Sequence, residues 1–94
     1  YPAEAEQALM QHPAVADVAC IGLPDAEMGE RLAAVVQLQP GIEADAAVLG
    51  DWCRERLAGY KRPRDFFFVE TLPRNAMGKL DKKALRTTYR AAAG

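Results

Sequence analysis

Residues 15–39, VADVACIGLPDAEMGERLAAVVQLQ, decide the fold of this chain. The first part, Val15 to Gly22, is apolar and partly β-branched, which is typical of a buried strand. Residues 23–30 carry Pro-Asp and Met-Gly pairs that favour a turn. From Arg31 to Gln39 apolar and polar side chains largely alternate, which predicts a half-buried second strand. A connection of about eight residues is too short for a helical crossover, so the two strands should be antiparallel.

The segments on either side predict three helices and one more strand. Residues 3–11 place a proline just before the helix and acids in its first turn, and His12-Pro13 end it. Residues 45–58 have helical spacing, and the aromatic run at 66–70 predicts a third strand. Asp81 is placed to cap a last helix. The order α-β-β-α-β-α predicts a small α+β domain with a roughly three-stranded, largely antiparallel sheet flanked by helices.

Length and charge narrow the function classes. The chain has 94 residues, of which 50% are hydrophobic and 27% charged, so it should form one compact domain. A domain of this size buries about 60–65% of its unfolded surface, which leaves too little for a deep catalytic cavity. The net charge of −1 conceals an asymmetry, because residues 1–59 carry −7 and residues 60–94 carry +6. We therefore expect no self-sufficient enzyme, but a cationic C-terminal third that contacts an anion.

The cysteines and the single histidine predict no metal site. Cys20 and Cys53 lie too far apart for a CxxC motif, and His12 completes no zinc ligand set, so buried thiols are expected. No run approaches the roughly 20 apolar residues of a membrane span, and residues 1–7 lack the layout of a signal peptide. These features predict a cytosolic location, and the missing initiator methionine suggests a piece of a longer protein.

The loop at residues 72–80, LPRNAMGKL, is the strongest candidate for chemistry. Lys79 follows a glycine, which lets the backbone approach a ligand closely, and a loop lysine delivers a point charge to phosphate or carboxylate oxygens. The loop is not a P-loop, because Pro73 stands where that motif needs glycine and Leu80 where it needs serine or threonine. On these residues alone, a solvated surface lysine is the simpler interpretation.

Several stretches taken together carry a more specific signal. In chain order they resemble the C-terminal domain of the adenylate-forming superfamily, which comprises acyl-CoA synthetases, peptide-synthetase adenylation domains and luciferases. The most specific stretch is PRNAMGKLDKKAL, residues 73–85. The matching stretches are residues 1–6, 12–22, 24–30, 60–63 and 72–80.

The resemblance implies that residues 1–94 are a single C-terminal lid domain of a larger acyl-CoA synthetase, inactive in isolation. The missing N-terminal domain would bind most of the ATP and Mg²⁺ and the carboxylic acid. Such enzymes convert the acid and ATP to an acyl-adenylate and pyrophosphate, and then transfer the acyl group to coenzyme A. Lys79 is implied as the catalytic residue that contacts the acid and the α-phosphate in the first step, with Gly78 and Asn75 in the same substrate loop.

The resemblance also implies that the lid turns on a hinge and presents a second face for the thiol step. Arg62 and Arg64 would donate to the 3′-phosphate of coenzyme A, and Tyr60 would lie against its adenine. Many CoA ligases of the family carry tryptophan where this chain has Met28. The residues implied for this face are Tyr1 and Pro2, the turn Met28-Gly29-Glu30, and the link Tyr60-Lys61-Arg62-Pro63-Arg64.

Two other function classes remain open from the sequence. One is the C-terminal subdomain of an adenylation domain that loads a carrier protein and ignores free coenzyme A. The other is a non-enzymatic module whose cationic third holds nucleic acid, with an affinity that falls steeply with salt. The basic link at residues 60–64 favours the CoA synthetase. The expected partners are thus the protein's own N-terminal domain, ATP, a carboxylic acid and coenzyme A, with no nucleic acid and no transmembrane segment.

Overall fold

The computed structural model describes residues 2–93, with the side chains of residues 2–90. Within this range the helices and strands follow the predicted order α-β-β-α-β-α, so the small α+β domain is confirmed. None of the helices in this range is both long and apolar enough to span a bilayer. The bounds are α1 Pro2–Met10, β1 Val15–Asp25, β2 Gly29–Leu38, α2 Ala46–Arg56, a 3₁₀ turn Gly59–Lys61, β3 Asp65–Val69 and α3 Lys82–Ala93.

The three strands form one mixed sheet in the order β1-β2-β3. β1 and β2 are antiparallel, as predicted, and both extend further than expected, so that only residues 26–28 connect them. β3 runs parallel to β2, from the pair Ala33–Asp65 to the pair Gln37–Val69. The parallel pair follows from the connection through α2, because a parallel neighbour needs a long crossover that is usually helical.

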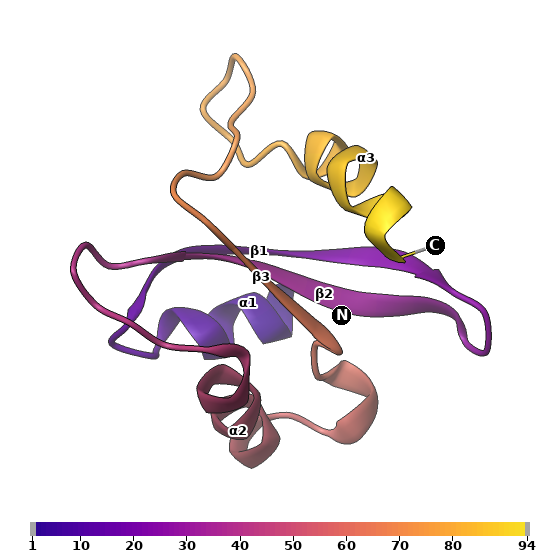
Figure 1. Ribbon diagram of the computed structural model, residues 1–94, viewed down its shortest axis with the longest axis horizontal. Coiled ribbons are helices and arrows are strands. Elements are labelled where there is room, and N and C mark those ends of the chain that lie inside the picture. The colour runs from indigo at the N-terminus through magenta and orange to yellow at the C-terminus, as the bar shows by residue number, and fades with distance from the viewer. Residues whose placement is uncertain (1, 94) are drawn as a thin grey trace.

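The sheet is covered on both faces (Figure 1). α1 and α2 lie on one face and α3 on the other. Ala34 and Val36 of β2 belong to the core under α1 and α2, whereas Ala33 and Val35 belong to the core under α3, and each is 0% exposed. The prediction of a half-buried second strand is therefore wrong. Polar residues at the ends of β2 suggested one solvated face, but its centre is buried on both sides, as in other doubly covered strands.

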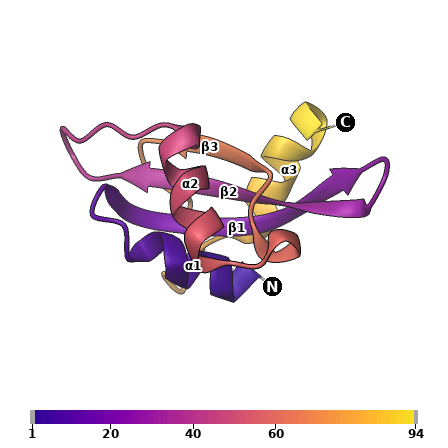
Figure 2. The same ribbon diagram turned by 90° about the horizontal axis from the view of Figure 1, so that it is seen from below.

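Local contacts fix the helices against the sheet. Asp45 caps α2, because its Oδ1 accepts a hydrogen bond from the Val48 amide at 2.9 Å. Asp81 caps α3 as predicted, accepting from the Ala84 amide at 3.0 Å. The Trp52 indole N–H donates to the Ala8 carbonyl at 2.7 Å and ties α2 to α1. Figure 2, which views the molecule from below, shows α2 in front of the strands with its lower end next to α1.

Both cysteines are buried and free, as predicted. Cys20 in β1 and Cys53 in α2 belong to the same core, under 2% exposed each. Burial, and then the charge of Glu6, raises the pKa of the Cys20 thiol to about 12. Burial also raises the pKa of Cys53. Both groups are thus neutral thiols that fill core space at physiological pH.

Candidate functional site

The loop that carries Lys79 is a short hairpin, here called the lysine hairpin (residues 74–80). Arg74 and Leu80 form a β-bridge at its base, and the Asn75 amide donates to the Lys79 carbonyl at 2.8 Å. The Gly78 amide donates to the Asn75 carbonyl at 2.9 Å, and Gly78 has a φ of +81°. A turn followed by a left-handed glycine is the usual form of a three-residue hairpin loop. The local sequence therefore dictates a tight hairpin here.

Asn75 organises the tip of the lysine hairpin. Its side-chain Oδ1 accepts hydrogen bonds from the Met77 amide at 2.9 Å and from the Lys79 amide at 3.2 Å. Asparagine at the start of a turn commonly binds backbone amides ahead of it in this way. The predicted site residues Asn75, Gly78 and Lys79 are thus brought together by backbone geometry.

Lys79 itself is exposed, and its ammonium has no hydrogen bond or ion pair to any side chain or carbonyl in the described part of the chain. Met77 beside it is 81% exposed. The whole segment 75–79 projects above the sheet on the side of α3, as the orange loop of Figure 1 shows. An unpaired cation on a protruding hairpin is suited to meet an anion on another surface.

One arginine connects this hairpin to the sheet. Arg74 Nη1 donates to the Gly78 carbonyl at 2.9 Å, and Arg74 Nη2 forms an ion pair with Asp17 of β1. The other oxygen of Asp17 accepts from the Val18 amide at 2.9 Å. Sequence reasoning missed this pair, because nothing local links residues that lie 57 positions apart.

The second group of predicted residues surrounds a pocket of about 300 Å³. This volume is at the lower limit for a small-molecule site. The pocket, here called the arginine pocket, lies where the β1–β2 turn (residues 26–28) meets the link between α2 and β3. Its lining residues are Met28, Glu30, Arg31, Leu32, Gly59, Tyr60, Arg62 and Arg64.

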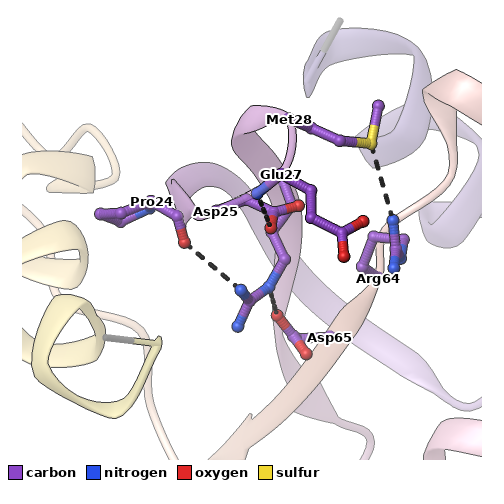
Figure 3. Close-up of polar contacts among 7 residues, drawn as sticks. Pro24, Asp25, Glu27, Met28, Arg64 and Asp65 are labelled. Carbon is purple, nitrogen blue, oxygen red and sulfur yellow. Dashed lines mark hydrogen bonds and ion pairs between the residues drawn. The ribbon is translucent and has the colours of Figure 1, made fainter.

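The side chains of the arginine pocket differ in how freely they can bind a ligand. Arg62 already donates through Nε to the Leu57 carbonyl at 2.9 Å and through Nη2 to the Arg54 carbonyl at 3.3 Å, which closes the end of α2. Among the described residues, the Arg64 guanidinium has only a 3.9 Å contact, from Nη1 to the Met28 sulfur (Figure 3). Tyr60 is 74% exposed. Arg64 and Tyr60 are therefore the more available groups.

A further arginine holds the β1–β2 turn in place. Arg31 Nε donates to Asp65 at 2.5 Å, and Nη1 donates to the Pro24 carbonyl at 3.3 Å (Figure 3). The hydrogen bond to Asp65 raises the pKa of Arg31 above its ordinary value, so the guanidinium stays protonated. This pair joins the start of β3 to the hairpin of β1 and β2, and sequence reasoning missed it too, because the two residues lie 34 positions apart.

Further residues predicted for the coenzyme A face are Gly29, Pro2 and Tyr1. Gly29 begins β2 with a φ of +78° and is exposed beside the arginine pocket. Pro2 lines a smaller adjoining pocket with Tyr60, and Tyr1 lies outside the described residues. The structure thus places the predicted site residues in two separate groups, one on the lysine hairpin and one around the arginine pocket.

Charged side chains outside the two groups bear on metal binding and on structural ion pairs. Among the described residues, no group of three or more His, Cys, Asp or Glu side chains is placed to hold a metal ion. On α3, Lys82 pairs with Glu6 of α1 at 2.7 Å, so this lysine makes a structural contact. The same Glu6 oxygen accepts from the Cys20 amide at 2.8 Å, on the edge strand β1.

Comparison with known proteins shows close relatives over nearly the whole chain. Residues 4–79 match the model of the AMP-binding enzyme C-terminal domain. The human mitochondrial malonate–CoA ligase ACSF3 is 48% identical over 87% of this chain. A Mycobacterium tuberculosis ligase, named for joining a methyl-dioxo-octahydroindenyl propanoyl group to CoA, is 49% identical over 92% of it.

Solved structures agree with these sequence matches. The apo structure of MatB from Rhodopseudomonas palustris superposes with a TM-score of 0.96 at 39% identity, covering 100% of this chain. A Mycobacterium tuberculosis fatty acyl CoA synthetase gives a TM-score of 0.90 at 42% identity over 98% of it. The chain spans only 14% and 17% of the two curated ligases, and 19% and 18% of the two solved chains.

Proposed function

Because the chain belongs to the AMP-binding enzyme C-terminal domain family, we propose that residues 1–94 are the C-terminal lid domain of a larger ATP-dependent acyl-CoA synthetase. The relatives support this assignment, since the ligases quoted above are named for joining acids to CoA. None of those names describes an enzyme that loads a carrier protein, so the alternative of a carrier-loading domain is not favoured. We assign the acid pocket, most ATP contacts and the Mg²⁺ to the N-terminal domain of the parent enzyme.

The proposed reaction has two steps. In the first, a carboxylate oxygen attacks the α-phosphorus of ATP, and the bond to the β-phosphate oxygen breaks to release pyrophosphate. In the second, the sulfur of coenzyme A attacks the acyl carbon, AMP leaves and the thiol proton is lost to solvent. The acid itself stays unassigned, because the lid does not line the acyl pocket in this proposal. The cytosolic location stays a prediction, and one relative is a mitochondrial protein.

Lys79 serves the first step. The observation that carries this role is its unpaired, exposed ammonium on the protruding lysine hairpin. Asn75 and Gly78 fix the backbone of this hairpin. Negative charge develops on the transferring phosphoryl group, and a cation placed there stabilises the transition state most when a closed site excludes water. The lid supplies both the cation and the closure.

The arginine pocket serves the second step. Arg64 donates to the 3′-phosphate of coenzyme A, and Tyr60 lies against the adenine, while Arg62 adds positive charge and Met28 with Gly29 shapes the rim. Support comes from the single pocket that Met28, Tyr60, Arg62 and Arg64 share. A pocket of about 300 Å³ accommodates only the nucleotide end of coenzyme A, so the pantetheine arm must extend beyond it.

The first experiment replaces Lys79 in the full-length parent enzyme. Lys79→Ala should lower acid-dependent ATP–pyrophosphate exchange by about 10²–10³-fold, because one charge-stabilising contact is lost. Thioester formation from supplied acyl-adenylate and coenzyme A should be nearly unchanged. Lys83→Ala is the matched control, since it removes another exposed lysine, on α3. Equal, small effects of Lys79→Ala on both steps would contradict the assignment.

The second experiment separates the two ends of coenzyme A. Arg64→Ala should raise KM for coenzyme A by about fivefold, the effect of losing an exposed charge-assisted contact. With dephospho-coenzyme A the same substitution should change KM by less than about twofold, because the 3′-phosphate is absent. The same rise with both thiols would mean that Arg64 does not contact that phosphate.

A further inference from the structure

The position of the Lys79 backbone depends on how the lysine hairpin is joined to the rest of the domain. Its base is fixed by Leu72, which is 3% exposed, and by Leu80, which packs on the core under α3. Residues 75–79, in contrast, are all exposed. Every hydrogen bond of that segment within the described chain stays inside the hairpin, including the bond that Gly78 accepts from Arg74. A second anchor is therefore needed to fix the direction in which the tip points.

Arg74 provides that anchor. Its guanidinium holds the Gly78 carbonyl on one side and the Asp17 carboxylate on the other. The Gly78 carbonyl belongs to the peptide unit that ends at the Lys79 nitrogen, so the bond acts directly on the backbone of Lys79. The planar fork of arginine fixes direction as well as distance, which a lysine at this position would not do.

The anchor point on β1 is made by an irregularity in the strand. The pairing register with β2 shifts between Val15 and Asp17, which is a β-bulge. Val15 and Val18 both belong to the core under α1 and α2, although residues three apart would face opposite sides of a regular strand. The bulge thus lets the strand bury Val15 and still direct Asp17 toward the hairpin. Bulges commonly re-aim a side chain in this way.

From this geometry we infer that Asp17 and Arg74 are positioning residues for Lys79, holding its backbone so that the ammonium reaches the α-phosphate during adenylate formation. The inference rests on the proposed function of Lys79. The pair is a poor candidate for a purely stabilising role, since its side chains are 49% (Arg74) and 24% (Asp17) exposed. Partly exposed ion pairs of this kind contribute little to global stability.

The test is a mutant cycle in the full-length parent enzyme. Arg74→Ala should lower kcat for ATP–pyrophosphate exchange by about 10–100-fold with little change in KM for ATP, because a small misplacement of a catalytic group is costly. Asp17→Asn should have a smaller effect in the same direction, since the Arg74 bond to Gly78 remains. In a Lys79→Ala background, adding Arg74→Ala should lower the rate of exchange by less than about a further twofold. The effects of residues that act through one another are not additive.

Controls separate positioning from other roles. Arg54→Ala removes an exposed arginine–aspartate pair within α2, far along the chain from the hairpin, and should leave exchange unchanged. Hydrogen exchange of the peptide 73–81 should accelerate in Arg74→Ala, while that of β2 stays the same. Thioester formation from supplied acyl-adenylate should also be unchanged.

Each contrary result has its own meaning. If the rate reductions of Arg74→Ala and Lys79→Ala multiply in the double variant, Arg74 acts independently of Lys79 and the inference is overturned. If Arg74→Ala lowers both half-reactions equally, its role is structural, which overturns it as well. If Lys79→Ala alone leaves exchange intact, the proposed function of Lys79 fails first and the inference falls with it. If Lys79→Ala abolishes exchange but Arg74→Ala leaves it unchanged, only the inference fails.

Discussion

The lysine hairpin and the β1–β2 turn are each braced by one arginine, yet they are built differently. Arg74 joins the Gly78 carbonyl to Asp17, and Arg31 joins the Pro24 carbonyl to Asp65. The β1–β2 turn closes an antiparallel ladder that runs to its last pair, Asp25–Gly29. The lysine hairpin has only one isolated bridge. The β1–β2 turn is held mainly by backbone pairing, and the lysine hairpin mainly by side chains.

This difference suggests how the two regions should respond to substitution. In the β1–β2 turn, strain is transmitted to a ladder that is part of the central sheet, so it should appear as lost stability. In the lysine hairpin, strain is confined to an exposed segment that can open without unfolding the core, so it should appear as lost activity. Three perturbations of decreasing size test the comparison, and the first is chosen to affect both regions alike.

Leu49→Ala should have the largest effect. Leu49 is 0% exposed in the core under α1 and α2, and it belongs to neither loop. Deleting such a side chain costs about 2–5 kcal/mol of unfolding free energy, a large part of the stability of a small domain. Urea unfolding should show this loss, and both half-reactions of the parent enzyme should fall together as the temperature rises. A selective loss of one half-reaction would contradict the expectation that a core substitution affects both regions alike.

Gly78→Ala and Gly29→Ala form a matched pair of intermediate size. Both glycines have positive φ, +81° and +78°, and a Cβ at either position would meet nothing within 4 Å. Each substitution therefore adds only the cost of a left-handed conformation, about 1–2 kcal/mol. Gly29→Ala should lower the unfolding free energy by that amount, because the ladder and the turn form one unit.

In Gly78→Ala the same strain should appear elsewhere. The unfolding free energy should change by less than about 0.5 kcal/mol, because the hairpin opens locally instead. ATP–pyrophosphate exchange in the parent enzyme should fall by about tenfold, as expected for a displaced catalytic group. If both alanine variants lose the same stability, the lysine hairpin is as firmly integrated as the β1–β2 turn, and the proposed difference is wrong.

The sequence predicted what depends on neighbouring residues. The apolar run of β1, the cap Asp81 and the glycine before Lys79 are local signals with local physical causes, and they gave the element order and the loop that presents Lys79. The ion pairs Arg74–Asp17 and Arg31–Asp65 could not be predicted, because their partners come together only once the chain has folded. The burial of both faces of β2 was missed for the same reason, since α3 covers it from the other end of the chain.

The smallest effect concerns Cys20, which lies in β1 between Asp17 and Pro24. Its folded-state pKa of about 12 exceeds the unfolded value of 9.0, so folding favours the protonated thiol. The stability from this preference is complete below pH 9.0 and is lost as the pH rises toward about 12. The unfolding free energy should fall in that window by up to about 1.4 kcal/mol per pH unit.

Cys20→Ala removes this titration and leaves every other titratable group in place. Urea unfolding at pH 8, 9 and 10 should therefore give a shallower decline in the variant than in the unchanged chain, whatever the variant loses at pH 8 through its smaller side chain. Identical slopes would mean that the Cys20 thiol ionises in the folded state as easily as in the unfolded one. That result would contradict the burial of the Cys20 side chain in the core under α1 and α2.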